Sequence, residues 1–162
     1  MTLEISDTQR TRLTPFLRKH LLAAHRLLKP ALTELSIALV DDATIARLHW
    51  QFMRLRGPTD VLTFELDHDN ESRVTSGEVV VCVPYARRSA KKDGVLLRHE
   101  LLLYCLHGML HLCGYDDRTQ SGFNRMHRKE DEILEKIGIG PVFKSGRAKS
   151  LSLKRRSKGT LR

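Results

Sequence analysis

One long apolar segment limits the fold of this chain more than any other feature. Residues 95–113 place apolar side chains on every side of the helix that they would form: Leu97, Leu101, Leu102, Leu103, Leu106, Met109, Leu110 and Leu112. A helix that is apolar around its whole circumference must be covered on all sides by other elements. We therefore predict a central helix over residues 95–113. Gly114 is expected to end it, because glycine readily adopts the left-handed conformation that closes a helix.

The apolar periodicity of the rest of the chain predicts further helices over residues 14–29, 41–53, 84–92 and 120–137 and strands over 34–40, 60–66 and 77–83. The last two strands are joined by a polar loop without a crossover helix, so we expect them to pair antiparallel. Strand 77–83 is nearly all apolar, which is typical of a central strand covered on both faces. This order favours an α+β (α/β-like) fold, in which helices pack on one small mixed sheet.

Composition excludes several classes of protein. The chain has 162 residues, of which 41% are apolar, and this suffices for the core of one domain. No apolar run approaches the roughly 18 residues of a membrane-spanning helix, and residues 1–7 do not resemble a secretory signal. The three cysteines are odd in number and have apolar neighbours, which is typical of reduced thiols. These features predict a cytoplasmic protein without a membrane partner.

The net charge of +9 is concentrated near the C-terminal end. Residues 144–162 contain eight lysines and arginines and no acidic residue, so nine minus eight leaves +1 for residues 1–143. Such a segment cannot bury enough apolar surface to fold alone. We predict a folded domain over residues 1–143 and a disordered basic tail over 144–162, which would contact nucleic-acid phosphates without sequence specificity.

The pair His107 and His111 is the clearest chemical signal in the chain. The two residues are four apart on the predicted central helix, so both imidazoles can reach one ion at roughly 2.1 Å. Gly114 can turn the chain back and bring Asp116 and Asp117 toward the same face. We predict Asp117 as the third metal ligand, with Asp116 as the alternative.

This set of ligands predicts a catalytic type of zinc site. Two histidines and one carboxylate leave a fourth position for water, whereas structural zinc has four protein ligands. One Zn²⁺ per chain is the expected cofactor, although iron, nickel and manganese also fit these ligands. Cys113 could add a ligand, but a buried free thiol is the commoner role for such a residue. Gly108 stands where the HExxH metalloproteases have the glutamate that serves as general base, which argues against a peptidase.

The same stretch is similar to a known family. Residues 107–116 satisfy ten of the eleven positions of the signature HGxLHLxGYDH of the YbeY endoribonucleases, also called ribosomal RNA maturation factors. Residues 57–64 resemble the family's PTDVLSF segment, and residues 77–81 resemble its GDIVI strand. Met126, Glu130, Ile133 and Leu134 fit its closing helix. The resemblance covers about residues 33–138.

The resemblance implies both a fold and an activity. The fold is a mixed four-stranded sheet surrounded by helices. The activity is metal-dependent cleavage of single-stranded RNA by an endoribonuclease, a hydrolase of phosphodiester bonds. The resemblance also implies roles in ribosomal RNA processing, including maturation of the 16S 3′ end, and in ribosome quality control. The ribosome or its small subunit would then be a partner.

Two departures from the family pattern concern the site. The family's third metal ligand is a histidine where this chain has Asp117, but a carboxylate is also a competent zinc ligand. The family has a functionally important arginine where this chain has Met53, five residues before the proline of the PTDVLSF segment. Arg54 and Arg56 lie beside that position, and we predict that one of them, with Arg54 favoured, serves as the catalytic arginine, since a guanidinium suits phosphate. The alternative is that both are solvated surface charges.

The sequence leaves open the roles of three other residues and two alternative functions of the protein. Glu130 shares the apolar face of the last helix, so we expect a structural hydrogen bond to the central helix, or else support of a metal ligand. His99 and Glu100 are expected at the surface or in a helix cap, although Glu100 could approach His107. A non-catalytic ribosome-assembly factor would hold a structural metal with four protein ligands. A hydrolase of peptides or small molecules would have a pocket too narrow for RNA.

Overall fold

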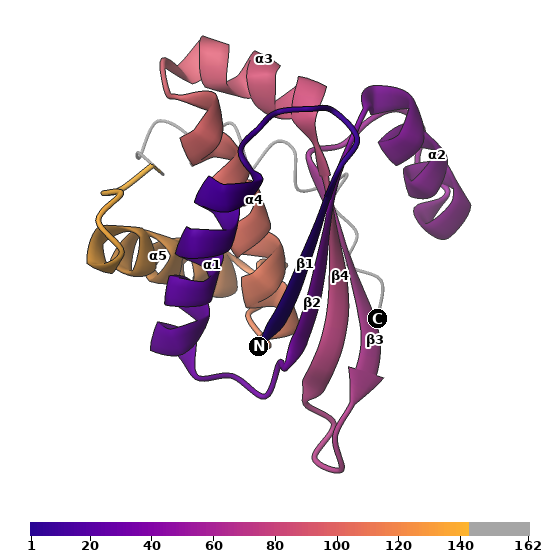
Figure 1. Ribbon diagram of the computed structural model, residues 1–162. Helices are drawn as coiled ribbons and strands as arrows, with labels where there is room; N and C mark the ends of the chain where they lie inside the picture. Colours follow the sequence, from indigo (N-terminus) through magenta and orange to yellow (C-terminus); the bar gives the residue numbers. More distant parts are fainter. Residues whose placement is uncertain (143–162) are drawn as a thin grey trace.

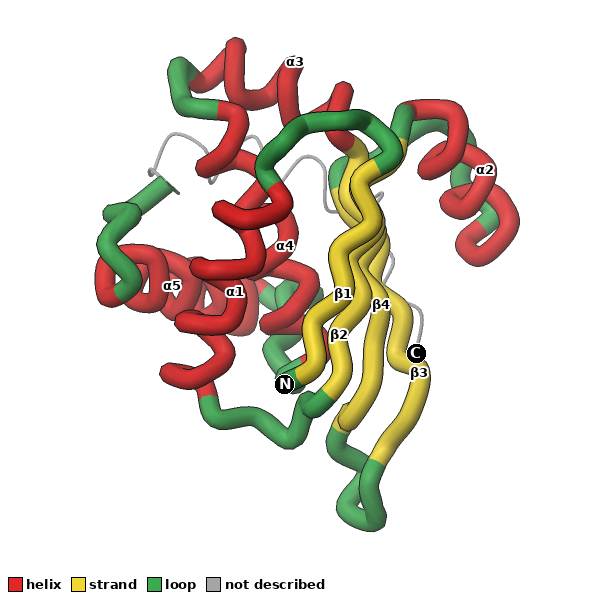
Figure 2. Tube along the Cα trace, in the orientation of Figure 1, coloured by secondary structure: helices red, strands yellow, loops and turns green. Residues whose placement is uncertain are grey.

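The computed structural model describes residues 1–142 of the chain. The segment predicted as a basic tail over 144–162 lies outside these described residues, so that division of the chain stays a prediction. Figures 1 and 2 show the arrangement of the strands and helices, whose bounds are β1 (Thr2–Asp7), α1 (Thr14–Leu28), β2 (Glu34–Val40), α2 (Asp42–Met53), β3 (Val61–His68), β4 (Val74–Cys82), α3 (Val83–Asp93), α4 (Leu97–Leu112) and α5 (Gln120–Lys136).

The strands of the described chain form one mixed sheet in the order β1-β2-β4-β3. β2 pairs in parallel with β1 and with β4, whereas β3 pairs antiparallel with β4. The predicted α+β fold with a mixed four-stranded sheet is therefore confirmed. The predicted antiparallel pair and the interior position of the most apolar strand, β4, are confirmed as well.

The apolar pattern of the sequence does not predict β1. Only Leu3 of this strand is buried, and its other residues are half-buried or exposed. β1 lies at an edge of the sheet, where its partner is β2, with Thr2 opposite Glu34. Since the strand has a weak pattern of its own, it depends on pairing with residues far away in the chain, which local periodicity cannot reveal.

Apolar clusters lie on both faces of the sheet. The larger cluster contains Val79 and Val81 together with buried side chains of α1, α4 and α5. The smaller cluster contains Val80 and Cys82 together with Ile45 of α2. Figure 1 shows the same division, because α2 lies on the opposite side of the sheet from α1, α4 and α5. Alternate residues of β4 thus enter different clusters, which explains why this strand is apolar at nearly every position.

The apolar segment forms α4, the central helix of the molecule. Every residue of α4 from Glu100 to Leu110 is buried, and the helix contacts α1, α3, α5, β3 and β4. Gly108 lies at a close approach to the sheet, because a Cβ added there would lie 2.5 Å from Cγ1 of Val79 and 3.2 Å from Oγ1 of Thr63. A side chain at residue 108 would therefore point into the sheet, and the glutamate of an HExxH site has no equivalent here.

The substitution Gly108→Ala is expected to lower the free energy of unfolding by about 1–3 kcal/mol, the usual cost of an extra methyl group in a packed core. The new methyl group would meet Val79 on an interior strand, which cannot move without disturbing both neighbouring strands. Urea unfolding of the two proteins measures the effect. In a double-mutant cycle with Val79→Ala, the combined loss should be smaller than the sum of the single losses, and simple additivity would contradict the close contact.

Candidate metal centre

The last two turns of α4 present His107 and His111 on one side of the helix. The chain then reverses at Gly114, whose φ is +94°. The amide of Gly114 donates to the carbonyl of His111 at 3.0 Å, and the amide of Tyr115 donates to the carbonyl of Leu110 at 3.0 Å. These bonds satisfy carbonyl groups at the end of the helix and fix the turn. The segment after the turn returns toward the two histidines, as the sequence predicts.

The structure brings His107, His111 and Asp117 together. Nε2 of His107 lies 3.1 Å from Nε2 of His111. The carboxylate of Asp117 places Oδ2 at 3.6 Å from Nε2 of His107 and Oδ1 at 3.7 Å from Nε2 of His111. A tetrahedral zinc ion with bonds of roughly 2.1 Å would separate its ligand atoms by about 3.4 Å. The three spacings are close to that value.

The hydrogen bonds of Nδ1 in His107 and in His111 leave the Nε2 atoms available to bind a cation. Nδ1 of His111 donates to the carbonyl of Tyr115 at 3.0 Å, and Nδ1 of His107 donates to the carboxylate of Glu130 at 2.6 Å. Because both Nδ1 atoms act as donors, each Nε2 atom presents a lone pair when its ring is neutral. Two lone pairs and a carboxylate that face one another repel unless a positive charge lies between them. The donor set therefore fits a divalent metal ion.

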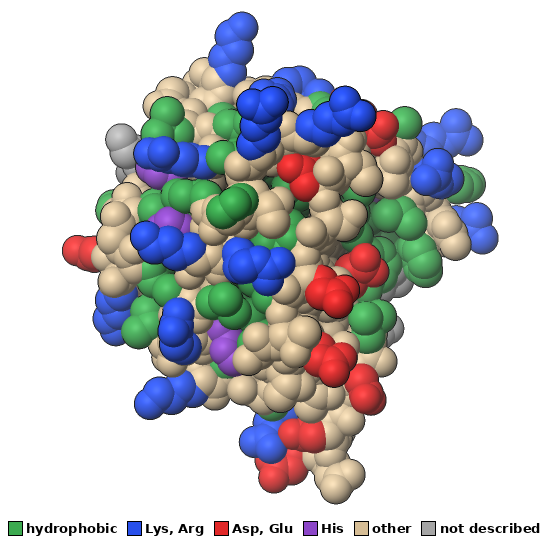
Figure 3. All heavy atoms as spheres, in the orientation of Figure 1, with side chains coloured by type: hydrophobic (Ala, Val, Ile, Leu, Met, Phe, Trp, Pro, Cys, Tyr) green, Lys and Arg blue, Asp and Glu red, His purple; other side chains and the backbone are tan. Residues whose placement is uncertain are grey.

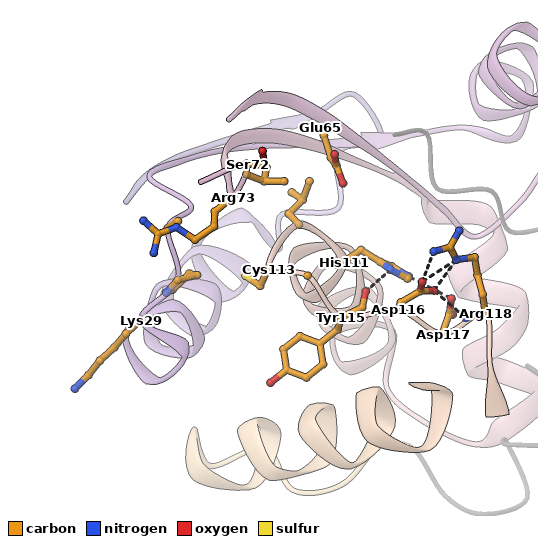
Figure 4. A pocket seen from close by; sticks show the side chains of 15 residues that line it. Lys29, Glu65, Ser72, Arg73, His111, Cys113, Tyr115, Asp116, Asp117 and Arg118 are labelled. Carbon is orange, nitrogen blue, oxygen red and sulfur yellow. Dashed lines mark hydrogen bonds and ion pairs between the residues drawn. The ribbon is translucent and has the colours of Figure 1, made fainter. Parts of the chain in front are cut away.

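Asp116 and Asp117 have different surroundings, which distinguishes the two candidates for the third ligand. Asp117 is buried, at 8% exposure, and faces the imidazoles. The carboxylate of Asp116 accepts from Nε of Arg118 at 2.7 Å, and Figure 4 shows the two side chains joined by dashed lines. Asp117 is thus placed as the sequence predicts for the third ligand, whereas Asp116 fixes the guanidinium of Arg118.

Replacing Asp117 by asparagine is expected to weaken zinc binding by more than the 10–100-fold typical for residues that only support a ligand. The amide keeps the shape of the side chain but removes the negative charge that faces the two imidazoles. Asp116→Asn is the matched control one residue away and should retain zinc binding. Competition with a chromophoric chelator measures both affinities, and an equal loss in the two variants would speak against Asp117 as the ligand.

Glu130 contacts His107 of the site and also His127, a residue that the sequence analysis did not single out. Its other oxygen accepts from Nδ1 of His127 at 2.5 Å. Burial alone would raise the pKa of the Glu130 carboxyl, but the nearby imidazoles of His107 and His127 outweigh it and hold this pKa at about 2. The predicted hydrogen bond from Glu130 to the central helix is confirmed, and its partner is a candidate metal ligand. The spacing of His127 three residues before Glu130, on the buried face of α5, was the available signal.

His111 and Asp117 line a cavity of about 850 Å³, which is large enough for a nucleotide-sized group. The end of α4, the loop 114–118, the segment after α1 and the β3–β4 hairpin supply its walls. Three cationic side chains lie among the lining residues, namely Lys29, Arg73 and Arg118. Figure 4 shows Arg118 next to Asp117, with Lys29 and Arg73 toward the other end of the cavity.

The two arginines predicted from the family pattern lie elsewhere. The guanidinium groups of Arg54 and Arg56 each lie 5.5 Å from the ring centroid of Trp50. Both side chains are exposed, and both residues follow the last residue of α2, a helix that lies on the other side of the sheet from α4 in Figure 1. The described residues that line the cavity include neither of them. Arg118 lines the cavity together with His111 and Asp117, and the sequence pattern did not single it out.

The structure also shows the positions of Glu100 and Cys113, for which the sequence analysis gave expectations. Glu100 is buried, at 2% exposure, and forms a hydrogen bond with the side chain of Tyr104, so its expected place at the surface was wrong. The reason is that α4 is covered on all sides, which encloses even its acidic residue. Cys113 lines the cavity but does not belong to the cluster of possible metal ligands found in residues 1–142. Burial raises the pKa of its thiol to about 12.

Comparisons with known proteins identify the family of this chain. The family model described as Endoribonuclease YbeY matches residues 3–138. The protein named Endoribonuclease YbeY from Rhodococcus jostii is 40% identical over 111 residues, which cover 63% of this chain and 62% of the relative. Its namesake from Bifidobacterium animalis subsp. lactis is 32% identical over 142 residues, which cover 83% of this chain and 78% of the relative.

A solved structure is similar as well. The solution structure of TM1509 from Thermotoga maritima matches with a TM-score of 0.57 at 26% sequence identity, and the match covers 83% of this chain and 91% of that chain. The described helices include none long and apolar enough to cross a membrane. The match with the Rhodococcus protein spans 62% of that relative's length, whereas the family model extends over almost the whole described chain. The chain therefore belongs to the YbeY endoribonuclease family.

Proposed function

We propose that this chain is a zinc-dependent endoribonuclease that cleaves single-stranded RNA. The observation that supports this most strongly is the cluster of His107, His111 and Asp117, two of which line the cavity. Membership of the YbeY family supports RNA as the substrate. We further propose ribosomal RNA as the cellular substrate, with roles in maturation of the 16S 3′ end and in ribosome quality control. The ribosome or its small subunit would be the partner.

Different residues of the site would have different roles in catalysis. When bound, Zn²⁺ would act as a Lewis acid toward the phosphodiester and help to activate the attacking group. His107, His111 and Asp117 would hold it. Glu130 and the carbonyl of Tyr115 orient the two imidazoles, because each accepts the Nδ1 proton of one ring.

Cationic side chains supply the contacts to phosphate. Arg118 is held by Asp116 beside the site, so its guanidinium is preorganised to meet the negative charge of a phosphate group. Lys29 and Arg73 would bind phosphates farther along the strand. We also propose that Arg54 and Arg56 contact the RNA, with Arg54 favoured for the role of the catalytic arginine.

Surface charge gives further support for a polyanionic partner. Figure 3 shows lysine and arginine side chains spread over the helical part of one face, while most acidic side chains of that face gather over the strands. Such a division attracts nucleic acid to one part of the surface and repels it from the other. The basic residues of 144–162 would add contacts that do not depend on sequence.

The other two functions have less support. A non-catalytic assembly factor with a structural metal would require a fourth protein ligand, and the cluster found in residues 1–142 has three members. A peptidase of the HExxH type would require a glutamate at residue 108, where any side chain would run into β4. Both points favour the nuclease.

The proposal is tested with one RNA sequence offered as a single strand and as a duplex. We expect the purified full chain to cleave the single strand and to spare the duplex. Removal of metal by a chelator should abolish cleavage, and addition of Zn²⁺ should restore it. Asp117→Asn protein purified in the same way controls for contaminating nucleases. Undiminished cleavage in the chelator, or no cleavage by protein shown to contain zinc, would refute the proposal.

A further inference from the structure

Glu130 joins two imidazole rings in the interior of the protein. Its Oε1 accepts from Nδ1 of His107 at 2.6 Å, and its Oε2 accepts from Nδ1 of His127 at 2.5 Å. The side chain of Glu130 has no exposed surface, and His127 is 7% exposed. Both carboxylate oxygens therefore depend on protein donors, and each histidine supplies one.

The ring of His127 is held in place by its neighbours. It packs edge-on against Phe123, with ring centroids 4.1 Å apart and an angle of 74° between the planes. It also lies nearly parallel to the ring of His107, at a centroid distance of 6.0 Å. These contacts leave the His127 ring little freedom to rotate, so it presents a fixed donor to Glu130.

A fixed donor matters because a glutamate carboxylate turns easily about its last torsion. With His127 bound to one oxygen, the plane of the Glu130 carboxylate is set and the other oxygen stays on Nδ1 of His107. A metal-binding histidine requires such a partner on its second nitrogen, since the partner fixes both the tautomer and the orientation of the ring.

We propose that His127 is a positioning residue of the metal site. Through Oε2 of Glu130, it keeps Oε1 on His107 and so keeps the Nε2 lone pair of His107 directed at the metal position. This inference rests on the proposed function only in that the site holds a metal ion, and it does not require RNA to be the substrate. The residue itself lies on α5, outside the signature around the metal ligands.

Two substitutions separate the hydrogen bond from packing. His127→Leu introduces an apolar side chain of similar bulk and removes the donor, whereas His127→Asn retains a side-chain N–H close to the position of Nδ1. We expect zinc affinity, measured by competition with a chromophoric chelator, to fall about 10–100-fold in His127→Leu and to return close to the wild-type value in His127→Asn. His127→Phe is a second variant without a donor, in case the leucine variant does not fold.

A second readout needs no metal. In the metal-free wild-type protein, the ring nitrogens of His107 should show a single tautomer with the proton on Nδ1, as observed by ¹H–¹⁵N correlation spectra of the imidazoles. In the variants without a donor, His107 should show a mixture of tautomers. Thermal unfolding of each variant establishes that it is folded under the conditions of the measurement.

The outcomes separate this proposal from the proposed function. Wild-type affinity and a single His107 tautomer in the donor-free variants would overturn the positioning role. A loss in His127→Asn as large as in His127→Leu would also overturn it, because packing would then explain both. If the wild-type protein binds zinc and these variants behave as expected, but no RNA is cleaved, then the proposed function fails and the role of His127 stands.

Discussion

His111→Ala protein is expected to cleave single-stranded RNA on the order of a thousandfold more slowly than the wild type. A metal Lewis acid contributes several kcal/mol to the stabilisation of the transition state, and each 1.36 kcal/mol corresponds to a factor of ten in rate. The variant removes one of the two imidazoles that face each other at 3.1 Å, so Asp117 and His107 alone would have to hold the ion. Initial rates on a short single-stranded RNA at fixed Zn²⁺ concentration measure the loss.

His20→Ala is the matched control for this substitution. His20 lies on α1, where its Nδ1 contacts the carbonyl of Phe16 at 2.8 Å, and it does not line the cavity. The control should cleave RNA at the wild-type rate. Full activity of the His111→Ala protein after exhaustive removal of metal would rule out a mechanism that depends on this site.

Glu130→Leu is expected to cause the largest loss of stability among the single substitutions considered, about 2–6 kcal/mol. It would leave two buried Nδ1–H donors, of His107 and His127, without an acceptor, and each such donor costs about 1–3 kcal/mol. Guanidinium unfolding of the metal-free proteins measures the difference without a contribution from bound zinc.

Glu132→Leu provides a control on the same helix. Glu132 is exposed and pairs with Lys129 at 3.2 Å and with Lys136 at 2.8 Å. Because exposed ion pairs contribute at most about 1 kcal/mol, this substitution should change stability little. A similar loss in the two variants would mean that the buried hydrogen bonds of Glu130 do not stabilise the fold.

The sequence predicts the parts of the fold that have a strong local pattern. α4 and β4 follow from apolar runs, because an element covered on all sides needs apolar residues at nearly every position. β1 was not predicted because its pairing with β2 unites residues far apart in the chain. Phe52 shows the limit of such patterns on α2, because this apolar residue is 43% exposed and packs against Phe64. In Figure 1, α2 lies beside one end of that face of the sheet, and periodicity cannot show where a covered face ends.

The candidate site also contains some residues that local sequence patterns predict and others that they do not. His107, His111 and Asp117 could be predicted because a helix and one glycine turn determine their relative positions. The spacing on α5 could indicate that His127 contacts Glu130. The positions of His127 and Arg118 relative to the site could not be predicted, since they depend on how α5 and the preceding loop pack against α4. The distance between Arg54 and the cavity likewise depends on the side of the sheet that α2 covers, which no local pattern indicates.

Anomalous diffraction at the zinc absorption edge, from crystals of the zinc-bound protein, tests the central claim most directly. The account predicts one peak per chain, roughly 2.1 Å from Nε2 of His107, from Nε2 of His111 and from a carboxylate oxygen of Asp117, with the remaining ligand position open to the cavity. A peak bound by other residues, or an ion enclosed by four protein ligands, would contradict it.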